Sequence, residues 1–504
     1  MPRTPALSFD RGTLILHPPP RGRAWIDYAT WDDRVEKFRV PALCYAALVE
    51  SLQTDQINFV DNAHQFERLE LIPSVTMQPY VHQEEALTAW QNQNRRGVVI
   101  LPTGSGKTYV AQLAMQAASC STLLVVPTLD LILHWFAHLK SAFPEIEVGL
   151  LGGGSRDKTP ILVATYDSAT IQAETIGNRY AMLVFDECHH LPTDFYRVIA
   201  EYAIAPYRLG LTATLDRSDG KHQDLQSLIG PTVYHRTPEQ LSGTALASHE
   251  KVQILVSLSP QEQALYQEKI ATRNEFLRQN RISLSGLEGW RRFVMASARS
   301  PEGRRAMLAH RQAKEIALCT DAKLRVLTQL LAQHFPEKTL IFTADNATVY
   351  KISQSFLIPA LTHQTPVKER HKILSYFREG QYQVIVASHV LNEGVDVPDA
   401  RIAIILSGTG SEREYIQRLG RVLRKGKTLD KQAILYEVVT EATSEERTSQ
   451  RRRGEIKPFK SKRKQATQHQ QLDLLNPRTT ESEPAKRAAE PSPKWQTEDP
   501  DIEF

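Results

Sequence analysis

The chain has 504 residues, of which 41% are hydrophobic and 23% charged, and its formal net charge is +4 at pH 7. One hydrophobic core rarely supports this length, so we expect roughly three domains in a globular protein. The apolar runs are too short to span a membrane, and the four scattered cysteines indicate neither a disulfide framework nor an iron–sulfur cluster, which predicts a cytoplasmic protein with reduced thiols.

Residues 1–68 are expected to form a small mixed domain, with a strand at 13–16 and a helix at 41–52. Beyond them, short continuous apolar runs alternate with helical lengths, first at 69–245 and again at 318–446. Such runs are typical of parallel sheets that are covered on both faces. We therefore predict an α/β fold with two parallel-sheet domains.

Between the two sheets, residues 246–317 carry no strand pattern and predict a helical module. Ser259 as N-cap and Glu262 closing a capping box mark the start of its first helix. The second half of the module is basic and includes Arg291 and Arg292. This half is either a solvated helix surface or an arm that lies over a nucleic-acid backbone.

The segment from 447 to 504 is rich in Arg, Lys, Gln, Ser, Pro and Glu, and it predicts a disordered basic and polar tail. Within it, QLDLL, from Gln471 to Leu475, resembles the short peptide by which bacterial proteins dock on the sliding clamp. Five-residue patterns arise often by chance in Gln-rich tails, so an incidental match is the favoured interpretation.

The sequence LPTGSGKT follows an apolar strand and precedes a helical stretch, which is the context of a phosphate-binding loop. Its glycines allow backbone N–H groups to turn toward phosphates at the positive end of a helix. Lys107 would reach the β- and γ-phosphates of ATP, and Thr108 would bind Mg²⁺. The candidate nucleotide-binding residues of this loop are Thr103, Gly104, Ser105, Gly106, Lys107 and Thr108.

The sequence LVFDECHH ends a second buried strand and allows two interpretations. Cys188, His189 and His190 would be zinc ligands in the first, but a structural zinc site normally takes four ligands from two separated pairs, and no second pair lies nearby. In the second, Asp186 would hold Mg²⁺ and Glu187 would orient and deprotonate the attacking water. We favour the magnesium and water site.

Further segments follow the motif order of superfamily 2 helicases, which the chain resembles. They are VVPTLDLILHW, TYDSA, LTATLDRSDG, LIFTADN, SHVLNEGVDVPDA and YIQRLGRVLRKG, with PYVHQEEAL upstream. Within that superfamily, DECHHLP, IGPTVY, FVMASARSPEGRRAMLAHRQAKEIA and GTGSEREYIQRLGR are similar to the xeroderma pigmentosum group B (XPB) DNA repair helicases. This resemblance implies a damage-recognition domain at 1–68, RecA-like domains at 69–245 and 318–446, and a helical thumb at 246–317.

The resemblance also implies roles for single residues. Gln83 would read the adenine, and Arg421 and Arg424, on one side of a helix, would stabilise charge on the transferred phosphoryl group. Gly394 and Asp396 would contact the nucleotide from the second domain. The residues implied in coupling are His189, Thr212, Ala213, Thr214 and Gln417. The residues implied in DNA binding are Thr128, Thr165, Arg217, Asp219, Thr343, Thr365, Arg291 and Arg292.

One triplet departs from the family pattern. The family carries Arg-Glu-Asp after the third motif, thought to act as a wedge at a duplex junction, whereas this chain has Arg217, Ser218 and Asp219. The missing glutamate leaves ATP hydrolysis intact in principle but puts strand separation at this element in doubt.

These features predict an ATP-dependent DNA translocase or helicase that acts in DNA repair, uses ATP and Mg²⁺, and has the 3′→5′ polarity that the resemblance implies. One alternative is an RNA helicase of similar architecture. Another is a DNA-opening scaffold subunit whose ATP cycle reshapes a complex with little processive unwinding. We recognise no nuclease constellation, so a partner nuclease and association with the nucleoid are expected.

Overall fold

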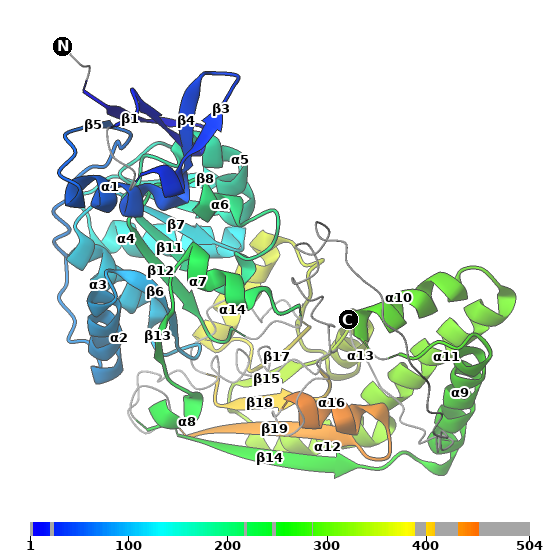
Figure 1. Ribbon diagram of the computed structural model, residues 1–504. Helices are drawn as coiled ribbons and strands as arrows, with labels where there is room; N and C mark the ends of the chain where they lie inside the picture. The colour runs from blue at the N-terminus through cyan, green and yellow to red at the C-terminus, as the bar shows by residue number, and fades with distance from the viewer. Residues whose placement is uncertain are drawn as a thin grey trace, which may run out of the picture.

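The computed structural model describes residues 4–20, 25–215, 219–243, 248–284, 286–388, 400–408 and 432–452. Within these ranges the chain forms three sheets in succession and a helical module that projects from the third (Figure 1). The predicted fold class, two parallel-sheet domains with a helical module and a small mixed N-terminal domain, is confirmed. None of the helices in these ranges is long and apolar enough to cross a membrane.

The N-terminal domain is a five-stranded mixed sheet in the order β3-β4-β2-β1-β5, with helix α1 packed against it. Leu14 and Leu16 alternate inward along one strand and meet Leu48 of the helix in a buried cluster. The elements are β1 (Ala6–Asp10), β2 (Thr13–His17), η1 (Ile26–Tyr28), β3 (Thr30–Asp32), β4 (Lys37–Pro41), η2 (Ala42–Cys44), α1 (Tyr45–Thr54) and β5 (Val60–Asn62).

The N-terminal domain is packed directly on the first parallel-sheet domain. The Asn178 side-chain amide donates to the Ala63 carbonyl at 2.8 Å, and Ile204 completes the N-terminal hydrophobic cluster. Gly12 has φ +82°, and a Cβ there would lie 2.4 Å from the ring of Tyr202. Because only glycine allows this approach, the two domains are closely fitted at this point.

The first parallel-sheet domain has eight strands in the order β13-β6-β12-β11-β7-β10-β8-β9, and its last strand alone runs antiparallel. Its central strands are buried throughout, as expected for a sheet covered by helices on both faces. The strands are β6 (Arg96–Ile100), β7 (Thr122–Val126), β8 (Val148–Gly152), β9 (Ser155–Arg156), β10 (Ile161–Thr165), β11 (Met182–Asp186), β12 (Tyr207–Thr212) and β13 (Thr232–His235). The helices are α2 (Val81–Asn92), α3 (Lys107–Ala118), α4 (Leu129–Ala142), α5 (Tyr166–Ile176), η3 (Cys188–His190), α6 (Val198–Glu201), η4 (Lys221–Asp224), α7 (Leu225–Leu228) and α8 (Pro238–Leu241).

The second parallel-sheet domain has six described strands in the order β14-β19-β18-β15-β17-β16, all parallel. The strands are β14 (Ser248–Val256), β15 (Thr339–Phe342), β16 (Ala360–Leu361), β17 (Val384–Ala387), β18 (Ile402–Ile405) and β19 (Gln432–Thr440). The helices are α12 (Asp321–His334), α13 (Asn346–Phe356), α14 (Val367–Glu379) and α16 (Ser444–Arg452).

Two boundaries differ from those drawn on the sequence. The sequence places residues 248–256 in the helical module, but they form β14, which pairs with β19 in a nine-residue register. Alternating exposed and partly buried side chains suit this edge position, where the ladder supplies the hydrogen bonds. At the other end, α16 runs to Arg452, beyond the expected start of the tail at 447.

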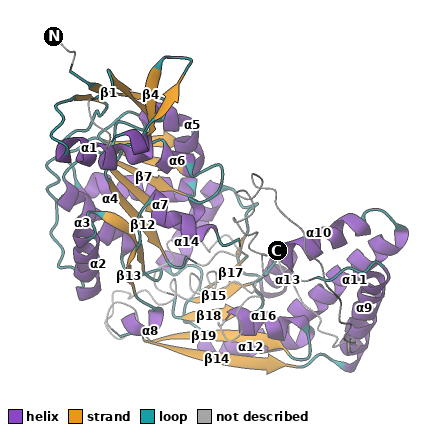
Figure 2. Cartoon of the chain, viewed as in Figure 1, coloured by secondary structure: helices purple, strands orange, loops and turns teal. Residues whose placement is uncertain are grey.

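The helical module consists of α9 (Pro260–Gln279), α10 (Gly286–Ser297) and α11 (Pro301–Leu318), which Figure 2 shows projecting beside the second sheet. Phe276, Phe293 and Ala306 form its own small core. At its base the Thr440 hydroxyl donates to the Ala317 carbonyl at 2.7 Å. The module is therefore attached to the second domain by its packing as well as by the chain.

Candidate ATP site and nucleic-acid face

The loop LPTGSGKT joins β6 to α3 at the carboxyl end of the first parallel sheet. Gly104 and Gly106 both have left-handed backbones, with φ +87° and +84°. A Cβ at Gly106 would lie 2.3 Å from Nε2 of Gln83. The left-handed conformation favours glycine at both positions, whereas the contact at Gly106 is with the movable end of a side chain, and the loop takes the turn that a phosphate cradle needs.

The side chain of Gln83 connects the start of α2 to this loop by hydrogen bonds. Its Oε1 accepts from the backbone N–H of Tyr80 at 2.9 Å, and its Nε2 donates to the Ser105 carbonyl at 3.1 Å. His82 Nε2 lies 2.9 Å from the same carbonyl. Gln83, which the resemblance assigned to the adenine, therefore has both ends of its amide bound to protein. The sequence did not predict the contact of His82.

Lys107, the first residue of α3, reaches across the loop. Its Nζ donates to the Leu101 carbonyl at 3.1 Å and lies 3.9 Å from Oε1 of Glu187. The nearby Thr103 hydroxyl is buried and has no hydrogen-bond partner among the described residues. An ammonium group and an unsatisfied hydroxyl at a helix N-terminus form a site that fits a phosphate.

Asp186 ends β11, and its side chain is held by two donors. The Trp135 indole donates to Oδ2 at 2.8 Å, and the backbone N–H of Glu187 donates to Oδ1 at 3.0 Å. Burial, together with the neighbouring charge of Glu187, raises the pKa of Asp186 to about 6. Trp135 lies on α4, the helix that follows the neighbouring strand β7. The sequence did not predict this hydrogen bond, although Trp135 belongs to the motif VVPTLDLILHW.

Glu187 has a left-handed backbone, with φ +48°, a strained conformation that is concentrated at functional sites. Its Oε2 lies 3.4 Å from Nδ1 of His189 and 3.4 Å from the Thr212 hydroxyl. Burial acts to raise the pKa of Glu187, but the charge of Lys107 and the hydrogen bond of His189 outweigh burial and hold it well below its ordinary value. These interactions favour the ionised form of the carboxylate.

His189 and Thr212 connect the carboxylates to the end of β12. His189 Nδ1 lies 3.0 Å from the Thr212 hydroxyl, which donates to the Thr214 carbonyl at 2.8 Å and accepts from the Thr214 backbone N–H. Ala213 lies between these two threonines and is buried. His189, Thr212 and Thr214, three of the residues that the resemblance implies in coupling, therefore form one connected set of polar contacts with Glu187.

The side chains of the zinc interpretation do not form a metal site, although the rings of His189 and His190 lie 4.3 Å apart. The Cys188 thiol is buried against Gly210, and burial raises its pKa well above the ordinary value. His189 contacts Thr212, whereas His190 is half-buried with its ring 6.0 Å from that of Tyr166. In the described part of the chain, no group of three or more His, Cys, Asp or Glu residues is placed to hold a metal ion.

The donors at the loop fit a hydrated Mg²⁺ ion. This ion takes oxygen ligands, keeps several waters, and is held by one or two carboxylates together with substrate phosphates. Asp186 offers a buried carboxylate that Trp135 fixes in place, and Thr108 offers a hydroxyl in the first turn of α3.

Several predicted residues lie outside the described residues. They are Arg217, Gly394, Asp396, Gln417, Arg421, Arg424 and the segment from Gln471 to Leu475. Asp219 is described and exposed, and its carboxylate accepts from the Lys221 backbone N–H at 3.1 Å.

The four candidate backbone-binding threonines differ in their surroundings. Thr128 and Thr165 are N-caps of α4 and α5, and their hydroxyls accept backbone N–H groups of those helices. Thr365 is half-buried and accepts from the Thr362 N–H. Thr343 is fully buried and donates to the Asp345 carbonyl, so its side chain presents no surface to a phosphate.

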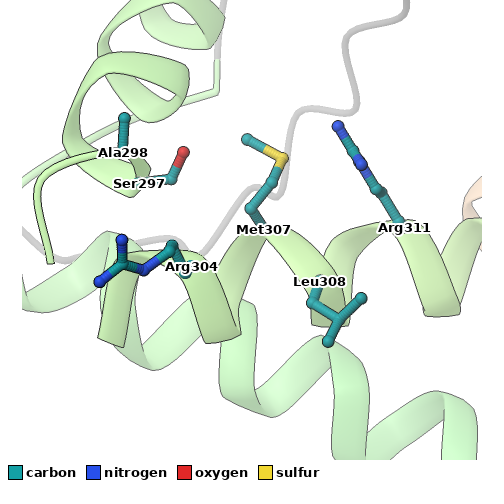
Figure 3. A pocket seen from close by; sticks show the side chains of 6 residues that line it. All are labelled: Ser297, Ala298, Arg304, Met307, Leu308 and Arg311. Atoms are coloured by element: carbon teal, nitrogen blue, oxygen red, sulfur yellow. The ribbon is translucent and has the colours of Figure 1, made fainter. Parts of the chain in front are cut away.

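The basic half of the helical module is exposed. Arg291 and Arg292 lie on α10, where Arg292 is 3.4 Å from Glu288. Arg304 and Arg311 lie two turns apart on α11 and border a cavity of about 260 Å³ (Figure 3). The cavity is lined by Ser297, Ala298, Arg304, Met307, Leu308 and Arg311.

Comparisons with known proteins agree with this geometry. Residues 7–63 match the xeroderma pigmentosum group B helicase damage recognition domain, 76–217 the type III restriction enzyme res subunit, and 322–426 the helicase conserved C-terminal domain. The DNA 3'-5' translocase XPB2 of Sulfurisphaera tokodaii is 39% identical over 424 residues, which cover 84% of this chain and 95% of that protein. The DNA 3'-5' helicase XPB of Kineococcus radiotolerans is 31% identical over 362 residues, covering 69% of this chain and 57% of that protein.

A solved structure shows the same fold at lower identity. Dbp5 of S. cerevisiae, bound to RNA and ADP BeF3, aligns with a TM-score of 0.50 and 16% identity, over 75% of this chain and 88% of that chain. Two RecA-like sheets, with a phosphate loop and paired carboxylates on the first, define a helicase-type ATPase of superfamily 2. With the sequence relatives above, the chain belongs to the XPB family of DNA helicases and translocases.

Proposed function

We propose that this protein is an ATP-dependent DNA translocase or helicase that moves 3′→5′ and acts in DNA repair. The observation that carries the proposal is the hydrogen-bonded chain from Glu187 through His189 to Thr212, beside the phosphate loop. These hydrogen bonds link Glu187, the group that would activate water, to Thr212 at the end of β12. From Thr212 the polypeptide continues toward the second domain. A damage-recognition domain packed on the same body favours DNA as the substrate.

The phosphate loop and the two carboxylates have different tasks in ATP hydrolysis. Backbone N–H groups of the loop and Lys107 bind the triphosphate. Asp186 and Thr108 would hold Mg²⁺, which would neutralise charge on the phosphates. Glu187, held ionised by Lys107 and His189, orients the attacking water and accepts its proton.

The second domain completes the site. Arg421 and Arg424 stabilise charge on the transferred phosphoryl group, an effect worth about 10³–10⁵ in rate for arginine fingers in general. Gly394 and Asp396 contact the nucleotide, and Gln417 joins the coupling residues. ATP binding then draws the two domains together, and hydrolysis releases them.

The nucleic acid lies across both domains and contacts Thr128, Thr165 and Thr365. Arg217 and Asp219 act at the duplex junction. The sugar–phosphate backbone of the nucleic acid is bound by arginines of the helical module, namely Arg291, Arg292, Arg304 and Arg311. Phosphate contacts carry no sequence information, so binding is independent of sequence and sensitive to salt.

A second candidate function is a DNA-opening scaffold whose ATP cycle reshapes a complex with little processive unwinding. Ser218, in place of the glutamate of the family triplet, favours it. In either role the protein works in the cytoplasm with the nucleoid and leaves cutting to a partner nuclease. The segment from Gln471 to Leu475 docks the protein on a sliding clamp. Replacing Gln471 and Leu474 with alanine would remove this contact.

ATP hydrolysis measured with duplex DNA, single-stranded DNA or RNA tests the proposal, with Glu187→Gln as the inactive control. A translocase or helicase is stimulated by DNA more than by RNA, and strand displacement separates unwinding from translocation alone. Equal stimulation by RNA, or no stimulation by any nucleic acid, would contradict the proposal.

A further inference from the structure

The helical module has an apolar surface on α11 that is bordered by two arginines. Arg304, Met307, Leu308 and Arg311 occupy positions i, i+3, i+4 and i+7 of the helix, which share one face. All four line the cavity of about 260 Å³, and the end of α10 forms its opposite wall (Figure 3). Leu308 is 56% exposed, and both arginines are exposed. This face of α11 therefore presents an apolar centre with a positive charge on either side.

The two arginines are not neutralised by the protein around them. Their neighbour Arg305 lies 3.2 Å from Glu302 on the same helix. By contrast, Arg304 and Arg311 have neither an ion pair nor a side-chain hydrogen bond within the part of the chain that the structure describes. Their charges are therefore available to a ligand.

The lining of the cavity indicates a peptide as this ligand. A volume of about 260 Å³ is below the range of about 300–1,000 Å³ that is usual for small-molecule pockets. A nucleic-acid backbone would use the two arginines but would place charged phosphates against Met307 and Leu308. A peptide with both acidic and apolar side chains matches the whole surface, because contact surfaces combine an apolar centre with a polar rim of complementary charge.

The chain itself contains such a peptide, outside the described residues. The sequence WQTEDPDIEF, residues 495–504, has four acidic residues and no basic one, and its apolar side chains are Trp495, Ile502 and Phe504. Aromatic side chains of this kind are common anchors of protein contacts. The charge of the segment is thus opposite to that of the α11 face, and its apolar side chains suit the centre of that face.

The connection of this segment to the module is long enough for the two to meet. The last described helix, α16, packs against α11 and ends at Arg452. Roughly 45 residues separate Arg452 from Glu498, and a random coil of that length spans roughly 35–40 Å. Leu308 lies about 15 Å along α11 from the end of the helix at Leu318. The distance to be covered is therefore within reach.

We propose that residues 495–504 bind the α11 face within the same chain and compete with nucleic acid for Arg304 and Arg311. Ile502 and Phe504 cover the apolar centre, and the carboxylates of the segment pair with the arginines. The contact is autoinhibitory, because it lowers DNA affinity until nucleic acid displaces the segment. The inference deepens the proposed function and rests on it, since it takes these arginines as part of the nucleic-acid path.

Binding of a labelled peptide tests the contact directly. The receptor is the full-length chain with its own acidic segment neutralised by Glu498→Gln, Asp499→Asn, Asp501→Asn and Glu503→Gln, here called the neutralised chain. Fluorescence anisotropy of a peptide with the sequence of residues 495–504 should show saturable binding that DNA competes away. Adding Leu308→Ser should weaken peptide binding about tenfold, because one covered apolar side chain is lost. Adding Arg304→Gln should weaken it about two- to fivefold, the effect of one exposed ion pair.

Two controls are matched to these changes. Leu357, at the end of α13 in the second domain, is 90% exposed, and Leu357→Ser should leave peptide binding unchanged. A peptide of the same composition in scrambled order should bind more weakly than the native sequence. Thermal unfolding monitors every variant, and if Leu308→Ser lowers the melting temperature, Arg304→Gln decides the peptide assay.

DNA affinity of the full-length chain tests the competition. We expect the neutralised chain to bind labelled single-stranded and duplex oligonucleotides about three- to tenfold more tightly than the unaltered chain at low salt. Leu308→Ser should tighten DNA binding to a similar extent although it changes no charge, and combining it with the neutralised segment should add nothing further. General repulsion between the acidic segment and DNA would not respond to Leu308→Ser.

Three results would overturn the inference. The first is no saturable peptide binding, or binding that neither Leu308→Ser nor Arg304→Gln weakens, which would place the segment elsewhere, for example on the basic run 451–464. The second is unchanged DNA affinity in a stable Leu308→Ser variant. The third is a dimer of the unaltered chain, detected by sedimentation, that the neutralised chain does not form, because the segment would then bind a second copy. Failure of the unaltered chain to bind DNA would instead remove the proposed function, and the peptide assay, which needs no DNA, would still report on the contact.

Discussion

Replacing Trp135 with phenylalanine removes one donor from the carboxylate that would hold Mg²⁺. The indole is 1% exposed and donates to Asp186 Oδ2 at 2.8 Å. A hydrogen bond to a charged group contributes about 1.5–3 kcal/mol, and partners that orient metal ligands contribute about 10- to 100-fold in metal affinity or activity. We therefore expect Trp135→Phe to raise the Mg²⁺ concentration needed for half-maximal ATP hydrolysis by at least about tenfold.

Trp90 offers a control of the same kind. Its indole is also 1% exposed and donates at 2.9 Å, but to the Arg208 carbonyl, away from the carboxylates. Trp90→Phe should lower the melting temperature without changing the Mg²⁺ requirement. The assay is a Mg²⁺ titration of ATP hydrolysis at saturating DNA. An equal Mg²⁺ requirement in both variants would refute the role assigned to the Trp135 hydrogen bond.

Three further predictions concern the same site. Glu187→Gln should lower kcat by about 10²–10⁴-fold while binding of an ATP analogue persists, and a kcat within tenfold of the original would refute its role as base. Gly106→Ala should weaken ATP binding, measured by equilibrium titration, because alanine strains a left-handed backbone and its Cβ would displace the side-chain amide of Gln83. Ordinary binding would show that the loop tolerates a side chain. Thr212→Val breaks the link to His189, so DNA stimulation of ATP hydrolysis should fall more than the basal rate, and an equal fall in both would contradict a coupling role.

The positions of the parallel strands and of the catalytic loop could be predicted from the sequence because their signals are local. The strands at 122–126, 161–165 and 182–186 are continuous apolar runs, and each is buried on both faces. Lys107 follows β6 and Glu187 follows β11, and β12 lies between these two strands. The two side chains still come within 3.9 Å, Nζ to Oε1, because parallel strands bring their carboxyl ends to one edge of a sheet.

Contacts between distant segments could not be predicted in this way. The hydrogen bond from Trp135 to Asp186, and that from Gln83 to Ser105, depend on how helices are placed over the sheet. Likewise, the alternating residues of β14 become a strand only because β19, more than 170 residues later, provides its partner. Local periodicity carries no information about such a partner.

The attachment of the helical module has a consequence for motion. The module begins after β14 and ends before α12, and both belong to the second domain. At its base, the Ser444 backbone N–H also donates to the Tyr266 hydroxyl at 3.0 Å. The helical module is thus fixed to the second domain, and we expect any rotation of that domain to move the far end of the module through a larger distance than its base.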